Sequence, residues 1–127
     1  MKFNLSILLV LAFLLATINA APTGTHNGDV TFFSPGLGSC GRVNKSSDKI
    51  CAVSKILYDR FTKNGNPNNN SLCGKKIAVT VGSKTVTVTM VDRCEACGPN
   101  DIDLSPGAFN KLAKPSQGRV RGHWKFV

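Results

Sequence analysis

The stretch Lys76-Ile-Ala-Val-Thr-Val-Gly-Ser-Lys-Thr-Val-Thr-Val-Thr-Met90 decides the fold class of this chain. Apolar residues alternate with polar or small ones on both sides of the Gly-Ser pair at positions 82 and 83. An alternation of period two, rich in β-branched side chains, is typical of half-buried strands. Gly-Ser between two such runs is a two-residue hairpin turn. We therefore predict an antiparallel hairpin with one face on the core.

Three further segments extend this pattern outward from the hairpin. Gly28–Phe33 is predicted to be a strand, since it is rich in β-branched and aromatic residues, and turn residues follow it. Gly118–Val127 alternates again and is predicted to be the last strand. Ser105 at the N-cap with Pro106 after it predicts a short helix.

The middle of the chain predicts a helix followed by a loop. Apolar residues spaced three and four apart over 50–61 predict a helix from Ile50, with Gly65 as its C-cap. The Asn-rich segment 64–71 is predicted to be an exposed loop. Short strands, two short helices and tight turns in a chain of this size indicate a small closed β-barrel.

The first 20 residues have the layout of a secretory signal peptide. Lys2 precedes an almost wholly apolar run over Leu5–Ile18, and small residues surround a cleavage site after Ala20. The apolar run is too short to serve comfortably as a membrane anchor. We expect a secreted, extracellular protein with a flexible leader at 21–27 and one domain at 28–127.

All five cysteines lie after the predicted signal peptide. A small secreted domain uses cysteines as disulfides, and an odd number leaves one thiol over. Cys94 and Cys97 form a C-x-x-C pair, but no second pair accompanies them, so we expect disulfide chemistry and no metal site. Asn44 and Asn69 begin sequons and are predicted glycosylation sites in a eukaryotic source.

The charge of the chain is strongly positive. Without Lys2, 15 basic residues face seven acidic ones, which gives a net charge of +8. Such a balance favours a polyanionic partner, such as wall polysaccharide, phospholipid or nucleic acid. The basic residues are scattered along the chain, so they do not identify the partner.

Several spaced motifs resemble those of a known family. They are Gly28-Asp-Val-Thr-Phe-Phe33, Gly36-Leu-Gly-Ser-Cys-Gly41, Cys73-Gly-Lys-Lys-Ile77, Val91-Asp-Arg-Cys-Glu-Ala-Cys97, Asp101-Ile-Asp-Leu-Ser-Pro-Gly-Ala-Phe109 and Gly118-Arg-Val120. In this order they resemble the double-psi β-barrel of expansin-like proteins, in particular the single-domain loosenins. Barwin, the bacterial rare lipoprotein A domain and family-45 endoglucanases share this barrel. The resemblance implies a mainly β, single-domain fold with six barrel strands, two short helices and a polysaccharide-binding groove.

The same resemblance assigns roles to groove residues. Asp103 matches the general acid of the related endoglucanases, and Asp92 matches a second acidic residue at the groove. The endoglucanase base would lie where this chain has Thr31, which matches a groove hydroxyl. Because an inverting hydrolase needs both an acid and a base, the resemblance implies a non-hydrolytic protein. Asp101 lies as close to the helix as Asp103 and stays an alternative for the acid.

Structural alternatives exist for both acids. Asp103 precedes the predicted helix and could favour its N-terminus electrostatically, whereas Asp92 could form a local ion pair with Arg93 or favour a turn. Arg93 is predicted to be a substrate-binding residue, although it departs from the expansin pattern, which has an aromatic residue there. Phe33 and Tyr58 are predicted to be the exposed aromatic residues for sugar binding.

The family pattern also implies the pairing of the cysteines. The implied disulfides are Cys40–Cys73 and Cys94–Cys97. Cys51 would be the spare, and we expect it to be a buried thiol.

Three functions follow from these features. The first is a non-hydrolytic, wall-loosening protein that binds cellulose, chitin or peptidoglycan. The second is a protease inhibitor or defence-type binding protein that acts through the loops at 34–38 and 64–71. The third is a lytic transglycosylase, which needs one acid and no external base. For the first we expect a monomer without cofactor, nucleic-acid partner or membrane contact after signal removal.

Overall fold

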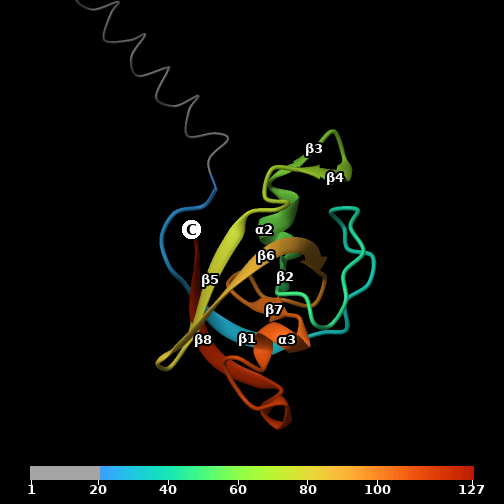
Figure 1. Cartoon of the computed structure of the whole chain (residues 1–127). Helices are drawn as coiled ribbons and strands as arrows, with labels where there is room; N and C mark the ends of the chain where they lie inside the picture. Colours follow the sequence, from blue (N-terminus) through green and yellow to red (C-terminus); the bar gives the residue numbers. More distant parts are fainter. Residues whose placement is uncertain (1–20) are drawn as a thin grey trace, which may run out of the picture.

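The computed structural model describes residues 21–127, which form one closed barrel with two short helices at its ends (Figure 1). The predicted signal peptide, 1–20, lies outside the described residues. Six strands close the barrel in the order β1-β7-β2-β6-β5-β8, which confirms the predicted fold class. These strands are β1 (His26–Phe32), β2 (Ile50–Ser54), β5 (Lys76–Val81), β6 (Lys84–Cys94), β7 (Ile102–Leu104) and β8 (Arg119–Phe126).

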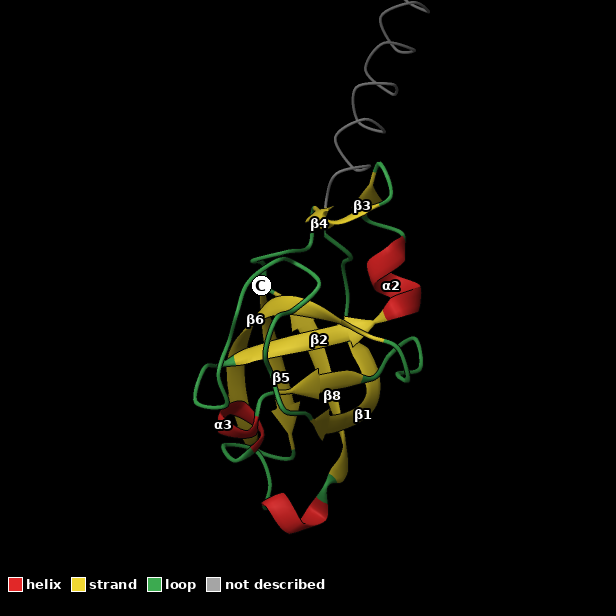
Figure 2. Ribbon diagram, turned by 90° about the vertical axis from the view of Figure 1, so that its right-hand side faces the viewer, coloured by secondary structure: helices red, strands yellow, loops and turns green. Residues whose placement is uncertain are grey.

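Two parallel strand pairs lie within an otherwise antiparallel barrel. β1 runs parallel to β7, and β2 runs parallel to β6. β2 and β7 lie side by side and antiparallel, so they join the two pairs. Figure 2 shows β2 crossing one side of the barrel with α2 (Lys55–Asp59) at its end. Among residues 21–127, no helix has the length and apolar character to cross a membrane.

The predicted hairpin is confirmed residue by residue. β5 and β6 pair antiparallel, with Val81 opposite Lys84, so the turn consists of Gly82 and Ser83. Gly82 has φ +60°, a conformation that glycine adopts without strain. Val79 and Val88 point into the core, as the alternation predicts.

The helix predicted from Ile50 was wrong over its first five residues and at its end, where Arg60 rather than Gly65 is the C-cap. Ile50–Ser54 form strand β2, and the helix covers only Lys55–Asp59. All five residues of β2 are buried, so neither face of the strand is open to solvent. A strand buried on both faces loses its alternation, and its apolar residues then also satisfy a helical spacing.

Two other boundaries differ from prediction. Residues 64–71 are not wholly a loop, because β3 (Thr62–Lys63) and β4 (Asn66–Asn70) form a small two-stranded sheet above α2 (Figure 1). Its residues 66–69 are exposed, as predicted. β1 begins at His26, opposite Trp124 on β8, so the last two residues of the predicted leader belong to the barrel.

The core fills the barrel and the space beneath the helices. Trp124, Tyr58 and Phe109 are its largest fully buried side chains. Trp124 donates its indole N–H to the Asn100 carbonyl at 2.9 Å and stacks on the ring of His26. The short helix α3 (Pro106–Phe109) begins after Ser105, as predicted, and places Phe109 in this core.

The cysteines pair as the family pattern implies. Disulfides join Cys40 to Cys73 and Cys94 to Cys97. Cys51, on β2, is the free cysteine and is fully buried, and this burial raises the pKa of its thiol.

Candidate functional site

A groove of about 310 Å³ lies beside the parallel strands β1 and β7. Asp103 on β7 lies directly opposite Thr31 on β1, and both side chains line the groove. The other walls come from Phe32, the Cys94–Cys97 segment, Asp101, Gly118 and Arg119. The structure therefore brings together Asp103, Thr31 and Asp101 from the predicted site residues.

Asp103 is a half-buried carboxyl group with one close donor. The hydroxyl of Thr31 donates to its Oδ1 at 2.8 Å. Burial raises the pKa of Asp103 above that of an exposed aspartate, although the Thr31 hydrogen bond and Arg119 oppose this effect. A raised pKa favours the protonated acid, which can donate a hydrogen bond or a proton into the groove.

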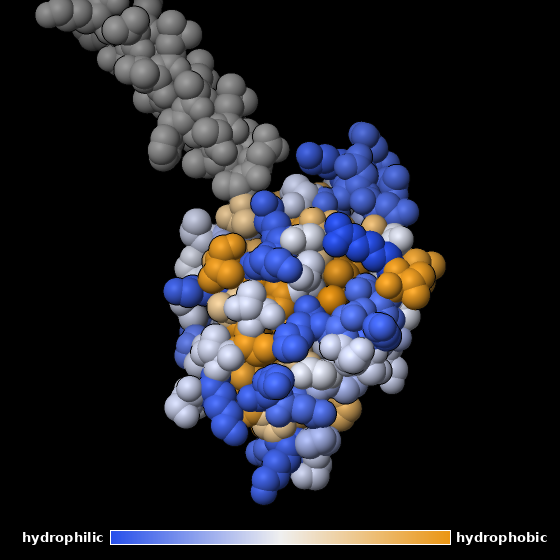
Figure 3. Space-filling view, in the orientation of Figure 1, coloured by the Kyte–Doolittle hydropathy of each residue, from blue (hydrophilic) through white to orange (hydrophobic). Residues whose placement is uncertain are grey.

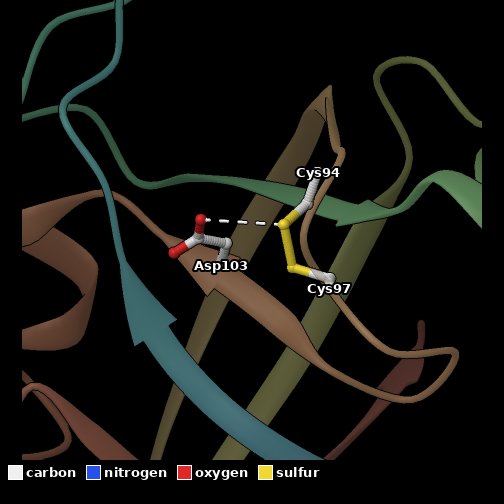
Figure 4. Close-up of side chains that lie close together, drawn as sticks. All are labelled: Cys94, Cys97 and Asp103. Atoms are coloured by element: carbon white, nitrogen blue, oxygen red, sulfur yellow. Dashed lines mark hydrogen bonds between the residues drawn. A yellow bond between two sulfur atoms is a disulfide. The ribbon is translucent and has the colours of Figure 1, made fainter.

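The disulfide Cys94–Cys97 forms the wall beside Asp103, as Figure 4 shows. Sγ of Cys94 lies 3.9 Å from Oδ2 of Asp103. A disulfide sulfur carries no proton, so this approach is a packing contact and supplies no hydrogen bond to the carboxyl group. The three side chains are close enough together to share a metal ion. In the disulfide form, however, neither cysteine offers the thiolate that a metal requires.

Asp101 is held by the backbone on both sides of its carboxylate. Its Oδ1 accepts the N–H of Asp29 at 3.0 Å, and its Oδ2 accepts the N–H of Gly98 at 2.9 Å. Gly28 allows this close approach, because a Cβ there would lie 2.1 Å from the carbonyl oxygen of Asn100. Asp101 thus fixes the loop that forms one edge of the groove.

Asp92 does not line the groove. Its Oδ1 accepts the backbone N–H and the hydroxyl of Ser39 at 2.9 and 2.6 Å, and the N–H of Arg93 at 2.8 Å. The side chains of Asp92 and Arg93 form no ion pair, so this alternative for Asp92 does not hold. Asp92 instead attaches the loop after β1 to the end of β6.

Arg93 faces a different hollow. Its guanidinium forms a two-pronged ion pair with Asp59 at 2.8 and 2.9 Å, and it also contacts Glu95. With Ser39 and Pro67 it lines a shallower space of about 520 Å³ below β3 and β4. The structure therefore separates Arg93 from the Asp103 groove.

The prediction that Tyr58 is an exposed aromatic was wrong. Tyr58 is fully buried, because its position on α2 faces the barrel, and its hydroxyl donates to the Pro67 carbonyl. Phe33 is only half-buried and does not line the groove, whereas its neighbour Phe32 is 39% exposed and does. Phe32 is the last residue of β1 and lies at the groove together with Thr31, whereas Phe33 follows the strand.

Arg119 is a groove residue that the sequence analysis did not assign. It lies on β8 opposite Thr31 and pairs with Asp29 at 2.8 Å. The motif Gly118-Arg-Val120 could have indicated Arg119 as a groove residue, since this motif belongs to the family pattern.

The predicted glycosylation sites lie outside the groove. Asn69 is exposed on β4, whereas Asn44 is half-buried and donates to Asp48.

Comparison with known families identifies this fold. The double-psi β-barrel family model described as lytic transglycolase matches residues 50–124, which include Asp103 and the disulfide beside it. The chain belongs to this double-psi β-barrel family. The predicted resemblance is thereby confirmed at the level of the family.

Two kinds of relative within the double-psi β-barrel family are similar to this chain. A papain inhibitor of Streptomyces mobaraensis is 36% identical over 104 residues, which cover 79% of this chain and 70% of the inhibitor sequence. The solved structure of a Streptomyces papain inhibitor gives a TM-score of 0.74, at 33% identity, over 94% of its chain. An expansin mutant of Clavibacter michiganensis in complex with cellohexaose gives 0.68 at 25% identity, but this chain covers only 50% of it.

Proposed function

We propose that the protein binds a polysaccharide chain in the Asp103 groove and loosens its packing without cutting it. The pairing of Asp103 with Thr31 is the observation that carries this proposal. A protonated Asp103 can donate a hydrogen bond to a glycosidic or hydroxyl oxygen, and Phe32 offers an exposed ring beside it. The expansin relative, which was solved with cellohexaose, supports a sugar chain as the ligand.

We propose no hydrolysis because the second carboxylate of the described groove is not free to act as a base. An inverting glycosidase needs a free base about 6.5–9.5 Å from its acid, to activate water. Among the described residues that line the groove, Asp101 is the other acidic residue. Both of its carboxylate oxygens already accept hydrogen bonds from backbone N–H groups. Thr31 stands at the position of the base and has no basic group.

One experiment tests binding and chemistry together. The protein is incubated with cellulose, chitin or peptidoglycan, the bound fraction is sedimented, and released sugars are measured in the same tube. We expect binding to at least one polymer without sugar release, and weaker binding for Asp103→Asn. Asp59→Asn is the matched control, since Asp59 is an exposed aspartate outside the groove. Reducing sugars would contradict the proposal and indicate hydrolysis, whereas anhydro-sugars would indicate a lytic transglycosylase.

Inhibition of a papain-type protease is the second candidate function. The similarity to papain inhibitors covers most of both chains and favours it. The loop after β1 gives it a structural basis, because Leu37 and Val43 are 73% and 79% exposed and face each other across an isolated bridge. An apolar patch stands at the right-hand edge of Figure 3, where Figure 1 places this loop.

This loop is held in place from several sides. The disulfide from Cys40 and the hydrogen bonds from Ser39 to Asp92 attach it to the barrel. A rigid apolar loop loses little conformational entropy when it enters a protease cleft. We expect sub-micromolar inhibition of papain, lost in Leu37→Asp/Val43→Asp and kept in the control Ile56→Asp, which changes an exposed residue of α2. Full inhibition by the loop variant would contradict the assignment.

A further inference from the structure

The outer wall of the barrel along β8 carries a line of three cationic side chains and one histidine. Inward and outward residues alternate on this strand, with Trp124 buried and its neighbours exposed. The four outward residues are Arg119, Arg121, His123 and Lys125. Because alternate residues of a strand lie about 7 Å apart, these side chains extend over roughly 20 Å of the surface.

Little negative charge compensates this line. Asp29 on β1 is shared between Arg119 at 2.8 Å and Arg121 at 3.4 Å. Both arginine side chains remain mostly exposed, at 62% and 73%. Within residues 21–127, neither His123 nor Lys125 takes part in an ion pair at all.

Among residues 21–127, the other acidic residues form no ion pair with these side chains. Asp48 contacts the loop at 44–45, Asp59 and Glu95 pair with Arg93, and Asp92 binds the Ser39 loop. Asp101 and Asp103 line the groove. A positive field therefore extends along this wall and attracts anions.

Hydroxyl groups lie beside the cationic line. β5 pairs with β8 on one side and with β6 on the other, and the outward residues of β5 and β6 are mostly threonines. Thr80 lies opposite His123 and shares a 2.8 Å hydrogen bond with Thr85. We call this surface the cationic face; it consists of Arg119, Arg121, His123, Lys125, Lys76, Thr80, Thr85, Thr87 and Thr89.

We propose that the cationic face is a second binding site, which takes an acidic polysaccharide as an extended chain. Carboxylates of the polymer would pair with the cations of β8, and its hydroxyls with the threonines. Arg119 belongs both to this face and to the Asp103 groove, so one glycan could run from the groove onto the wall. The site goes beyond the proposed groove function and does not require chemistry at Asp103.

The composition of the face argues against a single-stranded nucleic acid as its ligand. Proteins that bind single strands stack bases on aromatic side chains. The outward residues of β5, β6 and β8 include no Phe, Tyr or Trp.

The test compares two forms of one polymer. Binding of the protein to polygalacturonate and to its fully methyl-esterified, uncharged form is measured at low salt, about 20 mM, and at about 200 mM. We expect binding to the acidic form alone, weakened at the higher salt. Arg121→Thr/Lys125→Thr should bind about tenfold more weakly. The control Lys45→Thr/Lys49→Thr removes the same charge from exposed positions outside the face and should change affinity less than twofold.

Each contrary result has a defined meaning. Equal losses in the two double variants would show that net charge alone drives binding, and would overturn the proposal. Equal binding of both polymer forms would overturn it as well. Binding of duplex DNA that is tighter and depends on Arg121 would replace the glycan by a nucleic acid. Asp103→Asn separates the two sites, because it should weaken cellohexaose binding and leave polygalacturonate binding intact.

Discussion

The hydroxyl of Thr31 donates a 2.8 Å hydrogen bond to Oδ1 of Asp103 across the parallel pair of β1 and β7. This bond stabilises the ionised form of the carboxyl group, whereas burial stabilises the protonated form, and burial has the larger effect. The single donor thus limits how far the pKa rises.

Removing the donor should raise the pKa of Asp103 further. Thr31→Val keeps the shape of the side chain and the β-branched character of the strand, but it removes the hydrogen bond to the carboxylate. Carboxyl ¹³C NMR titration of Asp103 measures the pKa directly. Thr85→Val, which changes an exposed threonine on β6, should leave it unchanged. An unchanged or lower pKa in Thr31→Val would show that the bond does not act on the ionised form.

Asp103 should also make stability depend on pH. Its folded pKa lies above 3.8, so ionised Asp103 destabilises the native state at pH 7. The destabilisation disappears as the pH falls through the folded pKa and below the unfolded value. Asp103→Asn should therefore raise the Tm at pH 7 by a few degrees and have little effect below pH 3.8, as thermal denaturation would measure. A constant difference in Tm across this range would contradict the assignment.

The two disulfides should contribute differently to stability and binding. Cys40 and Cys73 are 33 positions apart in the sequence, whereas Cys94 and Cys97 are 3 positions apart. The chain-entropy estimate gives about 4 kcal/mol for the longer loop and about 2 kcal/mol for the shorter one. Urea denaturation of Cys40→Ala/Cys73→Ala and of Cys94→Ala/Cys97→Ala compares them. Only the second pair lines the groove, so only its removal should weaken cellohexaose binding.

Tyr58→Phe should affect stability and leave glycan binding unchanged. The variant loses the hydrogen bond to the Pro67 carbonyl inside a packed environment, which costs about 1 kcal/mol. Because Tyr58 is fully buried, cellohexaose affinity should stay within about twofold of wild type, as calorimetry would measure. A large loss of affinity without loss of stability would mean that Tyr58 contacts the ligand.

Local patterns predicted the outer strands better than the buried one. The β5–β6 hairpin and β8 have one face in the core and one in water, so their alternation is visible in the sequence. β2 has no exposed face, and its spacing was mistaken for a helix. The family resemblance, rather than periodicity, supplied the closed six-stranded topology and the disulfide pairing.

The candidate site was predictable in type but not in arrangement. Asp103 and Thr31 could be matched to the family, because each lies within a short motif. Whether Asp92 or Tyr58 reaches the groove depends on which side of the barrel each faces, and distant partners decide this. Ser39, which is 53 positions from Asp92 in the sequence, donates a hydrogen bond to the carboxylate of Asp92. The ring of Tyr58 is buried in the core.

The burial of Cys51 on β2 makes its thiol a natural probe of barrel opening. Its side chain lies fully buried in the hydrophobic core, and the other four cysteines are held in disulfides. A thiol-specific reagent can therefore modify the folded chain only when the barrel opens around β2. The rate of labelling at Cys51 measures how often this happens, without any engineered label, and ligand binding at the groove should slow it.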